Sequence, residues 1–108
     1  MELDLWIRSY EDELVFDLFE TEETRMGMEK IVLPNFAVRL NVVYFSTVYH
    51  IRSIIHLTIS VEQETDFVAS WLFTKLNGKT ARLEIDQSRV EIDEADIARL
   101  LRNKAKKT

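Results

Sequence analysis

The chain contains no cysteine, only two glycines, one proline and two histidines among its 108 residues. Without cysteine there is no disulfide, no thiolate nucleophile and no cysteine-bound zinc or iron–sulfur cluster. Because glycine occurs only at Gly27 and Gly78, the sequence has no glycine-rich loop of the kind that cradles phosphate groups. These absences exclude thiol chemistry and the glycine-rich class of nucleotide sites.

Long apolar runs are absent as well. The longest unbroken run is Val42 to Phe45, whereas a membrane-spanning helix needs about 20 apolar residues. The residues Met1-Glu2-Leu3-Asp4 are acidic, whereas the first residues of a secretory signal are basic. We therefore expect a cytoplasmic protein that does not bind a membrane.

The composition is that of an ordinary globular protein, with 46% apolar and 31% charged residues. A chain of this length can bury roughly two-thirds of the surface that its unfolded form exposes. No repeat or linker divides the sequence, so we expect a single domain over residues 1–108. Two parts of it are expected to lie outside the compact fold: a mobile loop at residues 20–30, around Gly27, and a basic C-terminal tail at residues 104–108.

Two neighbouring segments alternate in apolar character with the period of two that a β-strand requires. The first is residues 36–45, and the second is residues 49–61, in which one set of alternate positions is almost entirely apolar. The only non-apolar pair between them is Ser46-Thr47. We therefore predict an antiparallel hairpin with a tight reversal at this pair, although no glycine or asparagine marks a turn there.

Apolar residues three and four positions apart predict two helices. The first spans residues 63–77, where the expected core residues are Phe67, Val68, Trp71, Leu72 and Leu76, and Asn77-Gly78 would end it. The second spans residues 94–104, and Asp93 is expected to cap its free backbone N–H groups. Between these helices, residues 81–85 and 90–92 alternate as one or two short strands around Gln87-Ser88.

The N-terminal third fits two patterns. Residues 3–7 alternate as a strand, but residues 10–20 match either a second strand, paired back across residues 9–12, or a helix capped by Ser9. The β-branched and aromatic residues favour the hairpin slightly. Both alternatives give an α+β fold, with an antiparallel sheet of about four to six strands and helices packed on one face. The helical alternative gives a ferredoxin-like βαββαβ order with an added C-terminal helix.

The two histidines, His50 and His56, are the first candidates for a chemical site. Both belong to the polar set of alternate positions in residues 49–61, so we expect them on the less buried face of one strand. Six residues of extended strand span about 20 Å, which is too far for two ligands of one metal ion. No spacing identifies a carboxylate that would make either histidine a general acid or base. We therefore assign no catalytic residue, no metal ligand and no cofactor, and expect a function other than catalysis.

By elimination, the favoured function is a small acidic protein-binding module, such as a regulator, adaptor or inhibitor, that binds another protein or a second copy of itself. The expected contact residues are Trp6, His50, Arg52 and His56.

Two alternatives remain. One is a nucleic-acid-binding accessory protein that uses the C-terminal bases, namely Arg99, Arg102, Lys104, Lys106 and Lys107. The formal net charge of −5 argues against binding a polyanion. The other is a small enzyme that uses one of the histidines on the sheet.

Overall fold

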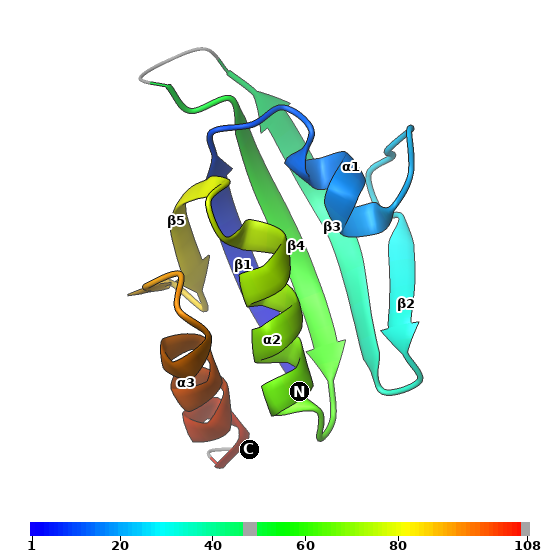
Figure 1. The fold of residues 1–108 in the computed structure, drawn as a ribbon. Coiled ribbons are helices and arrows are strands. Elements are labelled where there is room, and N and C mark those ends of the chain that lie inside the picture. The colour runs from blue at the N-terminus through cyan, green and yellow to red at the C-terminus, as the bar shows by residue number, and fades with distance from the viewer. Residues whose placement is uncertain (47–49, 107–108) are drawn as a thin grey trace.

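The protein is a six-stranded antiparallel sheet with three helices on one side (Figure 1). The computed structural model describes residues 1–46 and 50–106. In chain order the elements are β1 (Glu2–Ser9), α1 (Leu14–Phe19), β2 (Glu29–Leu33), β3 (Phe36–Phe45), β4 (Ser53–Val61), α2 (Thr65–Leu76), β5 (Thr80–Ile85), β6 (Ser88–Val90) and α3 (Glu94–Lys106). The strands lie in the order β2-β3-β4-β1-β5-β6. The α+β class and the expected number of strands are therefore confirmed.

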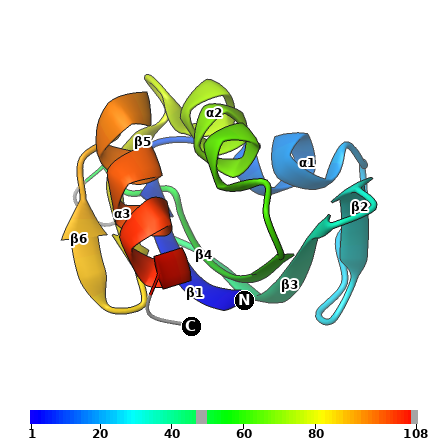
Figure 2. The ribbon, with the colours of Figure 1, turned by 90° about the horizontal axis from the view of Figure 1, so that it is seen from below.

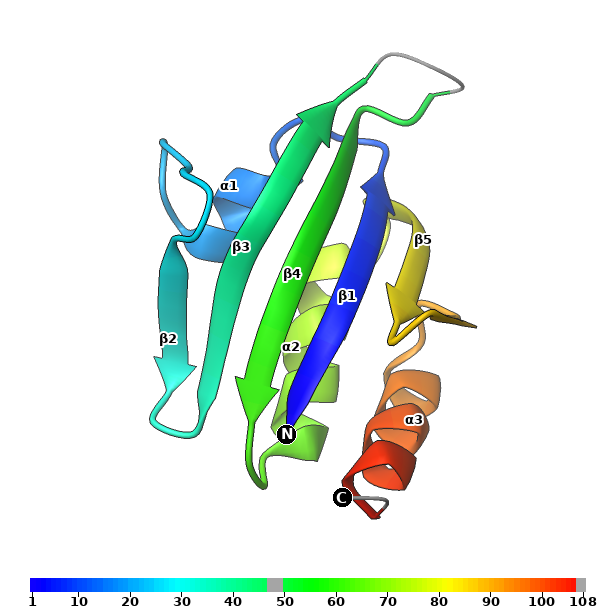
Figure 3. The same cartoon turned by 180° about the vertical axis from the view of Figure 1, so that it is seen from behind.

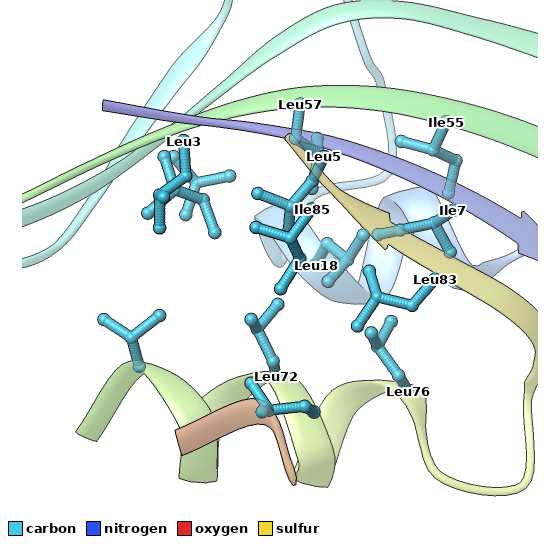
Figure 4. Close-up of a cluster of buried hydrophobic side chains, with 14 of the residues drawn as sticks. Leu3, Leu5, Ile7, Leu18, Ile55, Leu57, Leu72, Leu76, Leu83 and Ile85 are labelled. Atoms are coloured by element: carbon cyan, nitrogen blue, oxygen red, sulfur yellow. The ribbon is translucent and has the colours of Figure 1, made fainter. Parts of the chain in front are cut away.

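Alternation along the central strands separates the sheet into a buried and an uncovered face. In β1 and β4 every second side chain is buried, as Leu5 in β1 and Leu57 in β4 illustrate. These side chains meet the buried residues of the helices, including Leu72 and Leu76 of α2 (Figure 4). Seen along the sheet, all three helices lie within the concave side of its curve (Figure 2). One core therefore joins every helix to the sheet.

Residues 14–19 form a helix, so the slight preference for a hairpin in this segment is wrong. A strand would bury alternate residues, but the buried set is Leu14, Val15, Leu18 and Phe19, which only a helix places on one side. The connection from β1 is fixed at Ser9, whose hydroxyl donates to the Lys79 carbonyl at 2.7 Å and accepts from the Glu11 N–H at 3.0 Å.

The order β1-α1-β3-β4-α2-β5 therefore matches the ferredoxin-like alternative. Within the sheet these four strands are neighbours, in the order β3-β4-β1-β5. The short strands β2 and β6 extend the sheet at its two edges, and α3 follows β6. The fold thus consists of the βαββαβ core, the predicted C-terminal helix and two further strands, β2 and β6.

The hairpin between β3 and β4 is confirmed, but the tight reversal at Ser46-Thr47 is wrong. β3 ends at Phe45 and β4 begins only at Ser53, and Thr47 lies outside the described residues. Residues 50–52 are not part of a strand, and the Arg52 N–H donates to the Ser9 carbonyl at the end of β1, at 2.8 Å. This bond holds the backbone of Arg52 next to the last residue of β1.

Both predicted helices are present, but two residues of the expected α2 core are not fully buried and α3 ends later than predicted. In α2, Phe67 is 42% exposed rather than buried, and Trp71 is half-buried with its ring edge-to-face on Phe36. At α3 the Asp93 carboxylate accepts from the Ala95 N–H at 2.9 Å, as expected of a cap. The helix extends to Lys106, so residues 104–106 of the predicted tail are its last turn.

The segment predicted as a loop at residues 20–30 is shorter in the structure. Residues 20–28 connect α1 to β2, and residues 29–30 are already part of β2. Within residues 1–46 and 50–106, no helix has the length and apolar character that crossing a membrane requires.

Candidate functional site

One face of the sheet is left without a helix in the part of the chain that the structure describes, as the view from behind shows (Figure 3). Its side chains come from the alternate positions that do not contribute to the core. We call this surface the open face. It is formed by Asp4, Trp6, Arg8, Arg39, Tyr44, Ile54, His56, Thr58, Arg82 and Glu84.

An aromatic stack lies at the centre of the open face. Trp6 of β1 is the direct neighbour of His56 in β4, and the two rings are parallel within 6°, with their centroids 4.2 Å apart. The Nε2 atom of His56 contacts Oδ1 of Asp4, which lies two residues before Trp6 on the same strand. The imidazole is therefore covered on one side by the indole and held at its edge by a carboxylate.

The Asp4–His56 contact supplies the carboxylate that the sequence alone did not identify. A histidine held by a carboxylate is a common proton-transfer pair. However, neither Asp4 nor His56 lines the hollow described below. Within the described ranges, no group of three histidine, aspartate or glutamate side chains is placed to bind a metal ion. The role that this geometry supports is to fix the plane of the Trp6 ring.

A hollow of about 390 Å³ lies beside this stack. It spans four neighbouring strands, and its lining combines an apolar part with three charged side chains. The lining residues are Trp6, Arg8, Tyr44, Ile54, Arg82 and Glu84. The apolar part includes Tyr44, which is 56% exposed, so a ligand that entered the hollow would contact aromatic surface already accessible to solvent.

The charges around the hollow are unbalanced. Arg8 and Arg82 lie directly opposite each other in neighbouring strands, an arrangement that is unfavourable for like charges. Glu84 pairs with Arg82 at 2.8 Å, and no carboxylate among the described residues forms an ion pair with Arg8. The Nε atom of Arg82 is also buried without a hydrogen-bond partner. The hollow therefore has an excess positive charge that an anionic group would neutralise.

The structure brings together two of the four contact residues predicted from the sequence. Trp6 and His56 are in contact on the open face, but His50 and Arg52 precede β4 and do not lie on that strand. His50 is exposed in a turn with a φ of 67°, and Arg52 pairs with Asp12 at 2.9 Å. The prediction that His50 and His56 share one face of one strand is wrong, because the regular strand begins only at Ser53.

The C-terminal bases predicted for the nucleic-acid alternative are mostly engaged with carboxylates. Arg99 pairs with Asp96 at 3.1 Å, Arg102 with Asp66 at 2.9 Å, and Lys104 with Asp86 at 3.2 Å. Lys106 is the exposed last residue of α3. Lys107 lies outside the described residues. Because these partners offset the positive charge, the cluster is a weaker candidate for binding a polyanion.

A second, shallower hollow lies on the helical side and has a volume of about 920 Å³. Some of its charged groups form ion pairs: Glu20 contacts Lys30 at 2.9 Å and Lys75 at 3.7 Å, and Asp17 contacts Lys79 at 3.4 Å. The hydrogen bond from Lys30, together with the positive charges of both lysines, lowers the pKa of Glu20. Glu13 and Glu22 also line this hollow and form no ion pair with a described residue, so its lining has an excess of carboxylates and does not favour an anionic group.

Eight residues of the open face were not identified from the sequence, namely Asp4, Arg8, Arg39, Tyr44, Ile54, Thr58, Arg82 and Glu84. Asp4 and Arg8 are each two residues from Trp6 in the predicted strand, so they lie on the same face as Trp6. This spacing is the one local signal that could have pointed to them. Arg82 joins the site only because β5 pairs with β1, a contact between segments about seventy residues apart.

Comparisons with known proteins add no relative from which a function could be transferred. The chain matches no protein-family model, no curated protein and no solved structure.

Proposed function

We propose that this protein is a binding module, a small regulator, adaptor or inhibitor, that contacts a partner protein through the open face. The observation that supports this proposal is the uncovered centre of the sheet, where the fixed Trp6 ring borders a hollow with excess positive charge. Tryptophan and arginine are the residues most enriched among those that dominate binding energy at protein interfaces. A tryptophan whose plane is fixed before binding also loses little conformational entropy on binding.

The partner segment that fits this hollow has a carboxylate next to an apolar side chain. The carboxylate would lie between Arg8 and Arg82, where it would relieve the repulsion between two opposed guanidinium groups. The apolar side chain would pack against Trp6, Tyr44 and Ile54, which line the same hollow. Both contacts fall within one short segment, because the lining residues belong to neighbouring strands.

A protein partner is favoured over a nucleic acid by the distribution of charge. The net charge is −5, and three of the C-terminal bases are in ion pairs. The open face also includes Asp4 and Glu84 close to its arginines. A phosphate backbone requires several basic contacts along its length, whereas one carboxylate requires only the pair Arg8 and Arg82.

The proposal is tested by selecting peptides from a random displayed library on the wild-type protein. The selection uses the wild type alone, so that the affinity of the selected peptides for each variant is measured independently. The expected result is a consensus that combines Asp or Glu with a neighbouring aromatic or large aliphatic residue. The control variant is Arg99→Glu, which makes the same charge change on the helical side at a side chain that is 68% exposed.

Selected peptides should bind the Arg99→Glu variant as well as the wild type, and the Arg8→Glu variant on the order of tenfold more weakly or worse. The proposal is wrong if no peptide is enriched, or if the selected peptides bind the Arg8→Glu variant with unchanged affinity. It is also wrong if single-stranded RNA of random sequence binds at physiological salt and Arg8→Glu abolishes that binding, because the open face would then be a nucleic-acid site.

A further inference from the structure

One flank of β3 is an edge of the sheet over half of that strand's length. The adjacent strand β2 pairs only with residues 36–39 of β3. Next to these, Leu40 exchanges backbone hydrogen bonds with Gly27 and Met28, at 2.7 and 2.9 Å. From residue 41 to Phe45, no described residue forms a backbone hydrogen bond to this flank. We call residues 41–45 on this side the free flank.

Two residues of the free flank direct their backbone groups outward. The Ser46 N–H donates inward, to the Arg52 carbonyl at 2.8 Å. Because the direction alternates along an antiparallel strand, the N–H and C=O groups of Tyr44 point toward β4, and those of Val43 and Phe45 point away from it. Val43 and Phe45 therefore offer two donors and two acceptors to another strand.

The free flank lacks the features that normally protect a sheet edge. Protected edges are short or bear charged residues or proline. The opposite edge, β6, has three residues with Arg89 at its centre, and β2 contains Glu29 and Lys30 and is followed by Pro34. Residues 41–45, by contrast, are Asn-Val-Val-Tyr-Phe, without charge or proline. Tyr44 and Phe45 are each 56% exposed there.

We propose that the free flank pairs with the free flank of a second copy of this chain, in a symmetric antiparallel dimer. With the two-fold axis at Tyr44, Val43 of each copy lies opposite Phe45 of the other, and each of these two pairs exchanges both of its outward hydrogen bonds. Tyr44 then meets its own counterpart on the open-face side, and such aromatic cross-strand pairs are favourable. The uncharged sequence allows identical segments to meet without repulsion.

Charges beside the flank support a second copy as the partner. Arg25, in the connection that bonds to Leu40, is exposed and forms no ion pair with any described residue. At the other end of the flank, Asp12 lies beside Phe45 and Ser46 and pairs with Arg52, whereas its exposed neighbours Glu11 and Glu13 form no ion pair with a described residue. An antiparallel two-fold arrangement brings the Arg25 end of each copy toward the acidic end of the other. The charges of the two copies are therefore complementary.

The contact is small, so the dimer should be weak and should depend on concentration. Interfaces below roughly 1,200 Å² are typical of transient complexes. Sedimentation of the wild type should therefore give an average mass that rises above the 12.8 kDa of one chain as the concentration increases. Amide hydrogen exchange should report the pairing directly. Protection at Val43 and Phe45 should increase with concentration, while Tyr44 should be protected at every concentration because its N–H is bonded within the sheet.

Two variants test the location. Phe45→Lys places a charge on the free flank and removes no hydrogen bond within the sheet, and it should weaken dimerisation on the order of tenfold or more. Ile31→Lys is the matched control, because Ile31 is 69% exposed on β2, and it should leave dimerisation unchanged. The proposal is overturned if the wild type stays at the mass of one chain, if Val43 and Phe45 gain no protection, or if only the control variant dissociates the dimer.

This proposal does not rest on the proposed function, although Tyr44 belongs both to the free flank and to the lining of the hollow. Peptide binding at the open face is measured with Arg8→Glu, and dimerisation with Phe45→Lys, because Phe45 does not line the hollow. Failure of one proposal therefore leaves the other to be judged on its own data.

Discussion

Two adjacent residues of β4 should differ sharply in what they contribute to stability. Leu57 is completely buried, between Leu5 on one side and Leu40 on the other. His56 projects to the open face and is stacked on Trp6. Truncating each of them to alanine therefore compares the core with the open face at a single place in the sheet.

The magnitudes follow from the contacts that are lost. Leu57→Ala removes buried methyl groups and leaves a cavity, so the free energy of unfolding should fall by about 3 kcal/mol, within the usual range of roughly 2–5 kcal/mol. His56→Ala removes a ring stack that is worth about 0.5–1.5 kcal/mol. Its contact with Asp4 is partly exposed to solvent and adds little. The expected loss for His56→Ala is thus about 1 kcal/mol.

Urea unfolding followed by far-ultraviolet circular dichroism measures both changes, because this signal does not depend on the environment of Trp6. The slope of the unfolding free energy against urea concentration should be the same for both variants, because each exposes a similar surface area when it unfolds. In thermal unfolding, Leu57→Ala should lower the Tm by roughly 12 °C, at about 4 °C per kcal/mol for a domain near this size. Equal losses for the two variants would refute the assignment of His56 to an uncovered face.

Three further predictions concern the periphery of the fold. Gln87→Gly should raise the free energy of unfolding by about 0.5 kcal/mol, measured by urea unfolding. Gln87 has a φ of 70° in the turn between β5 and β6, where glycine is not strained. A decrease in the free energy of unfolding would contradict this prediction. Lys104→Ala should lower it by less than about 1 kcal/mol, the usual value of a partly exposed ion pair such as Lys104–Asp86, and a larger loss would show that this end of α3 is essential to the fold. Asp12 accepts a hydrogen bond from Arg52, which lowers the pKa of the carboxyl. This pair therefore stabilises the fold above the unfolded pKa of about 3.9 and loses its effect as the pH falls. Asp12→Asn should make the free energy of unfolding less dependent on pH in the acid range. An unchanged dependence would contradict this prediction.

Local sequence patterns predicted the two faces of the sheet well. Alternation alone placed Trp6 and His56 outside the core, and both lie on the open face. The pattern failed where two periods fit equally, as in residues 14–19, because the choice of a helix there depends on packing against α2 and the sheet. It also failed after Phe45, where no glycine or asparagine in the sequence marks a turn and the next strand begins only at Ser53.

The chemistry of the open face required the strand order, which no local pattern contains. Asp4 approaches His56 because β1 lies beside β4, and Arg82 approaches Arg8 because β5 lies on the other side of β1. These neighbours are separated by more than fifty residues in the sequence. The free flank of β3 likewise becomes visible only once β2 is known to begin at Glu29, opposite Arg39.

The indole N–H resonances of the two tryptophans measure the central claim most directly. Trp6 lines the hollow on the open face, whereas Trp71 lies on α2 with its ring against Phe36, on the other side of the sheet. When a selected acidic and apolar peptide is added to the nitrogen-labelled protein, the account predicts that the Trp6 resonance shifts until the site is saturated and that the Trp71 resonance stays in place. A shift of Trp71 with no change at Trp6 would contradict the account and place the contact on the helices.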